Sequence, residues 1–441
     1  MPKIKFTYLL VLFLSFTSLN YAQFYFFGRN KVQYEKFEWK VLKTEHFDIY
    51  YYDDFEELAE IGAKIAETAF DELKVKFNHI VLTKIPLIFY NTHIHFQQTN
   101  VLPSFIPEGV GGFFEFIKGR VVIPYTGSIE QFEHVVKHEL VHVFMTSKIF
   151  NILSDHRIPA DRYPPLWFVE GLAEYWSYHW DTQAEMVMRD AVLNNIFVPL
   201  ENIYAIYGSY LLYKEGQNLL SFISKEYGEE KIVQIMENFW RFSSFDDLLE
   251  FTLGEDVKII DEKWLYDLKQ EYYPLYENKF PHYIESKKIT DFGFNFSPNY
   301  FQSDSTDYIY FIGNRSGYSS VYRLLYSPKS KEIIEPEVII QGEREAVFES
   351  FHLLQSSISV SPEGLIAFVT KSGGSDVIHL YSIADDEIIN NFRYDDLISI
   401  RAPKFSSSGR KIVFNATDRK GFSDLFVMDM DTDNITRLTN D

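Results

Sequence analysis

The most constraining feature of the sequence is a pair of histidines, His138 and His142, four residues apart in a largely apolar segment. This spacing places both side chains on one face of an α-helix, where both imidazoles can reach a single cation. Ser128, followed three residues later by Gln131, predicts a capping box at the start of this helix. His134 would lie about 12 Å from His142 along the helix axis and is predicted to be structural. Because polar groups in an apolar helix are costly unless paired, we expect a metal ion at the histidine face.

Two carboxylate positions complete the predicted metal site. Glu139 lies between the histidines, where it can reach a metal-bound water without being a ligand itself. In residues 164–176, two prolines predict a helix start, and Glu170 and Glu174 follow four residues apart. Catalytic zinc bound by two histidines usually takes a carboxylate as its third protein ligand, which we expect to be Glu170. Glu174, one turn further on, is expected to hold a liganding histidine by its second ring nitrogen.

The segments HELVH at 138–142 and WFVEGLAEYW at 167–176 resemble those of the gluzincin metallopeptidases, the superfamily of thermolysin and aminopeptidase N. More closely, the chain resembles bacterial peptidase MA-like domains that precede a Tol-type β-propeller. The resemblance implies that the two histidines and Glu170 bind Zn²⁺. It also implies that Glu139 is the general base toward the zinc-activated water.

A third point of resemblance is the run Tyr-Lys-Glu-Gly at 213–216, similar to the aminopeptidase-N tyrosine that precedes a short glycine motif and stabilises the oxyanion. It implies that Tyr213 is catalytic. In a chain with 30 tyrosines, a packed core residue is the alternative, and Tyr207 and Tyr210 are further candidates for the same role. The Gly-x-Met-Glu-Asn stretch, which grips the free amino end of the substrate in that family, is absent. Endopeptidase and exopeptidase action therefore both stay open.

The predicted elements around the motifs fit a zincin-like α+β fold with an N-terminal mixed lobe and a C-terminal helical lobe. Hydrophobic patterning predicts strands at 47–52 and 85–90, with an amphipathic helix at 54–76 between them. Residues 109–124 predict a hairpin leading into the histidine helix. In the resembled family such an edge strand lines the substrate cleft and pairs with the peptide backbone. The glycines of this hairpin are equally well explained as turn residues.

The region between and after the two motifs supplies the rest of the helical lobe. A loop that contains Asp155, His156 and Asp161 is predicted between the motifs, at the rim of the cleft. Helical periodicity then predicts helices at 184–194, 209–227, 229–240 and 259–271.

After about residue 285, helical periodicity gives way to short alternating strands with an internal repeat. Residues 360–377 recur at 405–425 with Ser361 and Ser406 45 positions apart, and a looser copy begins at Phe296. The period is that of a propeller blade, and the pattern resembles the Tol-type β-propeller repeat. A β-sandwich with chance similarity is the alternative. Because propellers close with four to eight blades, three blades predict an incomplete propeller, in a fragment of a longer protein or an incomplete gene.

Residues 1–22 predict a secretory signal peptide. Lys3 and Lys5 form a basic start, residues 8–16 are an apolar core too short to span a bilayer, and cleavage would follow Ala22. An uncleaved anchor helix is the alternative. No later segment has transmembrane length, and the absence of cysteine excludes lipoprotein acylation and disulfides. We expect an extracytoplasmic protein, in the periplasm, at the outer-membrane periphery or secreted.

These expectations combine into an exported zinc metallopeptidase with a peptidase domain at 23–284 and propeller repeats at 285–441. Its substrate would be a peptide or protein, and the propeller would offer a surface for an envelope protein. The net charge of −21 argues against nucleic acid as a partner. The alternative is a non-catalytic envelope binding or assembly module, in which the propeller recognises a partner and the zinc domain is structural. Hydrolysis of a non-peptide substrate is a third possibility.

Overall fold

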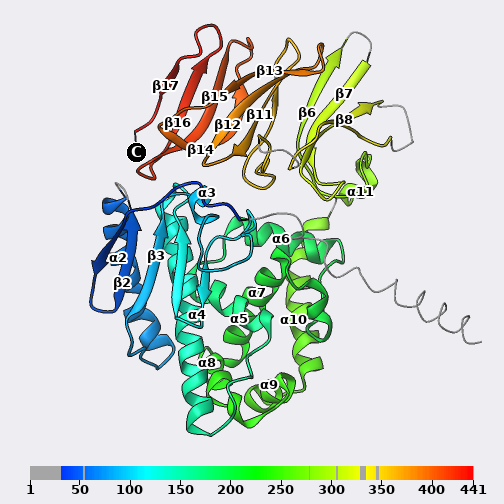
Figure 1. The fold of residues 1–441 in the computed structure, drawn as a ribbon. Helices are drawn as coiled ribbons and strands as arrows, with labels where there is room; N and C mark the ends of the chain where they lie inside the picture. Colours follow the sequence, from blue (N-terminus) through cyan, green and yellow to red (C-terminus); the bar gives the residue numbers. More distant parts are fainter. Residues whose placement is uncertain are drawn as a thin grey trace, which may run out of the picture.

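The computed structural model describes residues 31–52, 55–277, 279–303, 306–327, 334–343 and 347–440. A helix-rich part that contains one mixed β-sheet occupies the blue-to-green half of the chain, and three further β-sheets lie against one end of it (Figure 1). This arrangement confirms the part of the predicted fold class that places a helix-rich α+β region before several β-sheets. The predicted signal peptide lies outside the described residues, and the predicted boundary at 284/285 stays a prediction.

The mixed sheet has the strand order β1-β2-β3-β5-β4. Its strands are β1 (Trp39–Lys43), β2 (Phe47–Tyr52), β3 (Ile85–Tyr90), β4 (Phe113–Glu115) and β5 (Arg120–Pro124). The pairs β2/β3 and β3/β5 are parallel, and β1/β2 and β4/β5 are antiparallel. Parallel neighbours need a crossover connection, which the helix α2 (Glu56–Lys76) supplies between β2 and β3. The predicted hairpin at 109–124 is therefore β4 and β5, and β4 is an edge strand.

Alternate residues of the mixed sheet face two different layers. Ile49 and Leu87 belong to the main core, in which α2 and the histidine helix pack on the sheet. Tyr52 and Tyr90 point to the opposite side, where they pack with Phe37. The short helix α3 (His93–Phe96) and residues 97–112 follow β3 on this second side and lead to β4. The sheet therefore separates the helical core from the segment that carries the edge strand.

The histidine helix, α4 (Ile129–Asp155), begins as predicted at the N-cap Ser128, whose hydroxyl accepts a hydrogen bond from the Gln131 amide at 3.3 Å. The reciprocal half of the capping box is absent, because the Gln131 side chain accepts a hydrogen bond from Thr126 instead. Asp155 lies inside the helix, so the prediction that it belongs to a cleft-rim loop is wrong. About 20 Å of helix separates it from His142, and the adjacent His156 stacks on Trp240 with ring centroids 3.7 Å apart.

The helical lobe follows α4. Its elements are α5 (Leu166–Ser177), α6 (Thr182–Leu193), η1 (Leu200–Ile206), α7 (Tyr210–Tyr227), α8 (Glu230–Glu237), η2 (Phe239–Arg241), α9 (Phe245–Leu253), α10 (Val257–Tyr272), η3 (Tyr273–Tyr276) and α11 (His282–Glu285). The predicted helix at 229–240 ends at Glu237, and α9 has no counterpart among the predicted helices. Ser244 caps α9 through the Asp247 amide, and Gly254 ends it in the left-handed region.

The helices α5 and α7 cross backbone to backbone at two glycines. A Cβ added to Gly171 would lie 2.5 Å from the Gly216 carbonyl carbon, and one added to Gly216 would lie 2.4 Å from the Trp167 carbonyl oxygen. Neither backbone can retreat without moving its whole helix, so the site carried by α5 and α7 depends on both glycines. The glycine of the predicted Tyr-Lys-Glu-Gly run is thus a packing requirement.

We predict that Gly216→Ala will destabilise the fold by about 2–3 kcal/mol, because overpacking against backbone cannot be relieved by a rotamer change. Chemical denaturation followed by circular dichroism measures this difference. Gly111→Ala is the matched control, since the added methyl would meet only Val135 at 3.7 Å, an ordinary contact. Equal unfolding free energies for the wild type and Gly216→Ala would contradict the close crossing.

The three remaining sheets are four-stranded antiparallel meanders, each in sequence order. The first sheet contains β6 (Asn295–Ser303), β7 (Thr306–Gly313), β8 (Ser320–Tyr326) and β9 (Glu337–Ile340); the second contains β10 (Ser359–Val360), β11 (Leu365–Ser372), β12 (Ser375–Ser382) and β13 (Glu387–Phe392); the third contains β14 (Leu397–Phe405), β15 (Lys411–Asp418), β16 (Ser423–Asp429) and β17 (Ile435–Arg437). Each predicted repeat copy corresponds to one sheet. Neighbouring sheets share apolar cores: Tyr310 packs with Ile366 between the first and second, and Ile378 packs with Ile400 between the second and third.

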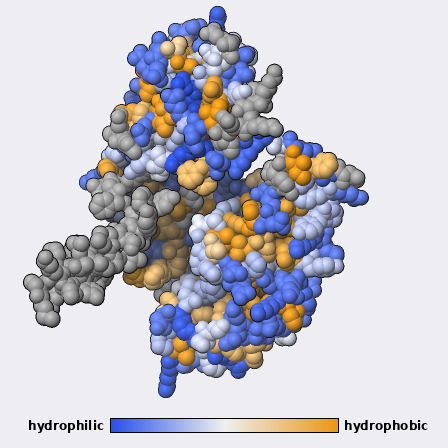
Figure 2. All heavy atoms as spheres, turned by 90° about the vertical axis from the view of Figure 1, so that its right-hand side faces the viewer, coloured by the Kyte–Doolittle hydropathy of each residue, from blue (hydrophilic) through white to orange (hydrophobic). Residues whose placement is uncertain are grey.

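The helix-rich part contacts the third sheet directly. The Asn91 amide donates to the Arg419 carbonyl at 2.7 Å, and a Cβ on Gly421 would lie 2.9 Å from the Phe55 ring. On the face shown in Figure 2, hydrophobic residues form separate patches among hydrophilic ones. Within the described ranges, no helix combines the length and the apolar character needed to cross a membrane.

Candidate active site

Three side chains from α4 and α5 point their polar atoms at one another. His138 and His142 lie on one face of α4, and their Nε2 atoms are 3.2 Å apart. Glu170, on the first turns of α5, places Oε2 3.5 Å from each of these nitrogens. The structure therefore brings together the three predicted zinc ligands, which are half-buried.

This triangle fits a tetrahedral metal ion. Two ligands of a tetrahedral zinc at about 2.0–2.1 Å from the metal lie roughly 3.3 Å from each other. The three observed separations of 3.2, 3.5 and 3.5 Å are close to this spacing. Two imidazole nitrogens and one carboxylate oxygen are also the donor set of catalytic zinc sites with an open fourth position.

Glu174 connects His138 to a buried lysine. Its Oε1 lies 3.1 Å from His138 Nδ1, the nitrogen that faces away from Glu170. Its Oε2 accepts a hydrogen bond from Lys214 Nζ at 2.5 Å, and Lys214 also donates to Gln217. Glu174 thus occupies the outer position that the sequence predicts for it. The lysine partner was missed, because a lysine at an inward helix position has no sequence signal until its partner on another helix is known.

The charges of this cluster shift the proton affinities of its members. Burial works to lower the pKa of His138, but Glu170 and Glu174 outweigh it and raise that pKa to about 10. Burial works to raise the pKa of Glu170, yet hydrogen bonds to His138 and His142 hold it at about 2. The pKa of Glu174 is also lowered, because contacts with His134, His138 and Lys214 outweigh its burial. Both glutamates therefore stay ionised, and the negative charge favours a cation at the His138 and His142 nitrogens.

Glu139 differs from the other two glutamates in its surroundings. It is 5% exposed, and burial raises its pKa, while His138 and His142 work against the shift. The loop before β4 approaches it closely, since a Cβ added to Gly112 would lie 3.1 Å from Glu139 Oε1 and 2.9 Å from Val135. The predicted hairpin therefore borders the site, and its edge strand β4 lies beside Glu139. Glu139 is thus a buried carboxylate with a raised pKa beside the triangle of His138, His142 and Glu170.

Tyr213 is the candidate tyrosine that faces the cluster. Its ring lies parallel to that of His138, with the centroids 6.5 Å apart. Burial raises its pKa, and Glu170, Glu139 and Glu174 raise it further. Its hydroxyl therefore keeps its proton at neutral pH. Tyr207 and Tyr210 are exposed, and Tyr210 covers Lys214.

His134, which the sequence predicts to be structural, lies on α4 beside the cluster. Its ring stacks on Tyr178 with centroids 4.7 Å apart, and its Nε2 lies 3.7 Å from Glu174 Oε1. His134, His138 and Glu174 are also close enough to hold an ion. Lys214 already contacts Glu174, so a second cation here would meet a positive charge. The Glu170 triangle is the better metal site.

Residues 69–270 match the family model of the Peptidase MA superfamily. The matched segment contains α4, α5 and α7, and therefore every residue of the cluster described above. The match supports a peptidase. No curated protein matches the chain.

Solved structures resemble parts of the chain. TolB from Acinetobacter baumannii is 18% identical over 34% of this chain and 33% of its own, with a TM-score of 0.26. A puromycin-hydrolyzing peptidase from Mycobacterium tuberculosis is 12% identical over 33% of this chain and 21% of its own, with a TM-score of 0.25. A putative TolB from Agrobacterium tumefaciens is 14% identical over 34% of this chain and 63% of its own, again at 0.25. The chain thus covers about a third of the first of these proteins.

We predict that Lys214→Met will weaken zinc binding by about 10–100-fold, the usual effect of losing an outer contact of a ligand. Without the lysine, Glu174 loses the contact that holds its carboxylate against His138 Nδ1. Competition with a zinc chelator measures the affinity. Lys148→Met is the matched control: Lys148 is also buried on the inside of the fold, but it donates to the Phe77 carbonyl and Glu237. Equal affinities for all three proteins would contradict this role.

Proposed function

We propose that the protein is an exported zinc-dependent metallopeptidase. The observation that supports it most directly is the triangle of His138, His142 and Glu170 with the buried carboxylate of Glu139 beside it. The Peptidase MA match over 69–270 supports the same class of enzyme. The substrate class would be peptides or proteins, with endo- and exopeptidase action both open.

In this proposal His138, His142 and Glu170 hold the zinc ion. Zinc bound in such a site lowers the pKa of a water and polarises a carbonyl oxygen. Glu174 fixes the His138 ring so that its Nε2 faces Glu170, and Lys214 holds Glu174 in place. The protein therefore supplies an oriented donor set whose outer contacts lie in a buried part of the fold.

Glu139 would take the proton from the attacking water and pass it to the leaving amine. Its raised pKa brings its proton affinity closer to that of the groups with which it exchanges protons. Tyr213 would donate a hydrogen bond from its hydroxyl to the carbonyl oxygen as negative charge develops on that oxygen. The edge strand β4, next to Glu139, would pair with the backbone of the bound peptide.

The proposal extends to the rest of the chain. Residues 23–284 would be a gluzincin-like peptidase domain, and the three four-stranded sheets of 285–441 would be blades of an incomplete Tol-type propeller. The match of repeat period to sheet supports this arrangement. The predicted signal at 1–22 would place the protein in the periplasm, at the outer-membrane periphery or outside the cell. The propeller would contact an envelope protein.

We predict that Glu139→Gln will retain zinc and lower kcat for peptide cleavage by about 10²–10⁴-fold, because the amide cannot accept the water proton. Cleavage of a mixed peptide library, read by mass spectrometry with zinc content measured in parallel, tests this. Glu133→Gln on the same helix is the control, because Glu133 is half-exposed and pairs with Lys137. A zinc-loaded wild type that cuts nothing while binding a partner tightly would instead favour a non-catalytic binding module.

We predict that Tyr213→Phe will lower kcat by about 10²-fold with little change in KM, since the lost hydroxyl acts on the developing oxyanion. Steady-state kinetics on a cleaved library peptide measures both constants. Tyr204→Phe serves as the control, because this tyrosine on η1 is 66% exposed. If Tyr213 only fills space, phenylalanine will preserve the packing and kcat will not change.

A further inference from the structure

The segment that leads to the edge strand has no regular structure of its own. Residues 97–112 lie between α3 and β4 without helix or strand, and side-chain hydrogen bonds to their backbone carbonyls add to the few backbone hydrogen bonds that hold them. Within the helix-rich part, His93 Nε2 donates to the Val110 carbonyl at 3.1 Å, and Gln97 Nε2 donates to the Ile106 carbonyl at 3.2 Å. The segment ends at Gly112, which meets Glu139. Any displacement of these residues therefore moves the wall of the candidate site.

The second sheet, together with the loop at 347–358 that leads into it, supplies further contacts to this segment. Gln355 Nε2 donates to the Glu108 carbonyl at 3.4 Å. The Leu354 side chain lies 3.4 Å from the place where Gly109 would carry a Cβ. Lys371, which is 6% exposed, donates from Nζ to Gln97 Oε1 at 3.4 Å. Because Gln97 in turn holds Ile106, the second sheet reaches the segment at two points, residues 106 and 108.

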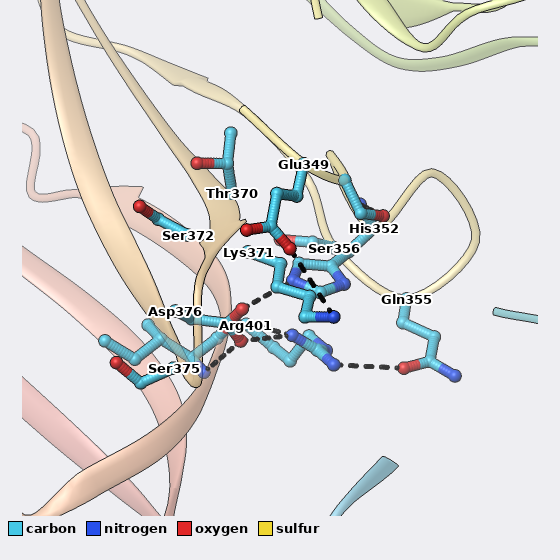
Figure 3. A network of polar contacts seen from close by, with 12 residues as sticks. Glu349, His352, Gln355, Ser356, Thr370, Lys371, Ser372, Ser375, Asp376 and Arg401 are labelled. Atoms are coloured by element: carbon cyan, nitrogen blue, oxygen red, sulfur yellow. Dashed lines mark hydrogen bonds and ion pairs between the residues drawn. The ribbon is translucent and has the colours of Figure 1, made fainter. Parts of the chain in front are cut away.

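Both contacts start from a polar network on the second and third sheets (Figure 3). Arg401 donates from Nη2 to Gln355 Oε1 at 3.3 Å and from Nη1 to Asp376 Oδ2 at 2.6 Å. The fully buried Asp376 also accepts from the Ile400 amide and faces His352 Nε2 at 2.7 Å. The contact with Asp376 fixes the Arg401 side chain, and Arg401 in turn orients Gln355.

The contact from Lys371 to Gln97 is also held by neighbouring side chains. Lys371 lies 3.6 Å from Glu349 Oε2 and 5.6 Å from the centre of the Tyr34 ring. Tyr34 donates its hydroxyl to Glu349 Oε1 at 2.6 Å. Both pairs of contacts thus run from charged groups fixed in the sheets, through an amide side chain, to a backbone carbonyl of residues 97–112.

We propose that the second sheet and the loop at 347–358 that leads into it form a positioning element of the candidate active site, in which Gln355 and Lys371 hold residues 97–112 and thereby place β4 beside Glu139. Gly112 follows Glu108 by four positions, a span of at most about 14 Å. Release of the segment at 106 and 108 would let its end move relative to α4. The inference deepens the proposed peptidase function and rests on it for its catalytic consequence.

The positioning itself is tested by hydrogen exchange, which does not depend on activity. The double variant Gln355→Ala/Lys371→Met in the full-length zinc-loaded protein removes both contacts. We expect the amides of residues 106–115 to exchange at least about fivefold faster, the factor for one net hydrogen bond, and those of α5 to be unchanged. Unchanged exchange at 106–115 would overturn the proposal. If the double variant does not fold, Gln355→Ala alone, at a partly exposed position, gives the same decision.

The third sheet offers a matched control for general loosening of the sheets. Asp424 occupies the repeat position of Asp376 and contacts Arg437, which has no contact with residues 97–112 among the described hydrogen bonds and ion pairs. Arg437→Gln and Arg401→Gln each remove an arginine from such an aspartate, but only Arg401 also orients Gln355. We expect faster exchange at 106–115 in Arg401→Gln alone. Equal acceleration in both variants would assign the effect to sheet stability and overturn the proposal.

Peptide kinetics on the same variants distinguishes this inference from the proposed function. A displaced β4 should raise KM several-fold and change kcat less, because the strand would bind the substrate backbone, whereas a general loss of folded protein would lower kcat at constant KM. Changes in kcat alone would count against a positioning role. If the wild type and Glu139→Gln are both inactive, the proposed function fails, and the exchange experiment still decides whether the second sheet positions β4.

Discussion

The candidate site depends on one buried charge pairing, the contact of Glu174 with both His138 and Lys214. A carboxylate or an ammonium group inside an apolar fold is strongly unfavourable alone. Here each finds its partner on a different helix: His138 on α4, Glu174 on α5 and Lys214 on α7. The same contacts that make these charges tolerable also fix the orientation of the His138 ring, so stability and site geometry have a common origin.

This pairing requires the helices to be unusually close. The crossing of α5 and α7 at Gly171 and Gly216 brings Lys214 within 2.5 Å of Glu174. A side chain at either glycine would hold the helices apart and lengthen that contact. Two residues without side chains thus determine whether a charged cluster can form beside them. On its other flank the site is bordered by Gly112, where a Cβ would lie 3.1 Å from Glu139 Oε1.

The three four-stranded sheets contribute more than an appended surface. They lie against one end of the helix-rich part (Figure 1) and share cores with one another. Their polar contacts with the helix-rich part include two with backbone carbonyls, those of Arg419 and Glu108. Hydrogen bonds to backbone carbonyls fix the path of residues 97–112 and do not depend on the side chains that these acceptor residues carry. An arrangement of this kind links the placement of the edge strand β4 to the sheets, which is the physical basis of the positioning role proposed for Gln355 and Lys371.

The sequence by itself determined most of the local elements and the shared face of His138 and His142. Four-residue spacing places His138 and His142 on one face whatever surrounds them, and the 45-residue repeat specifies one sheet per copy. The long-range partners could not be predicted from the sequence. Lys214 has the pattern of a solvated residue, and no local signal places Asp155 at the end of α4. Tertiary structure decided these points and the contact of the second sheet with residues 97–112. The physical reason is that helical and strand periodicity are local properties, whereas buried charges pair with residues tens of positions away and the loop at 97–112 packs against residues more than two hundred positions away.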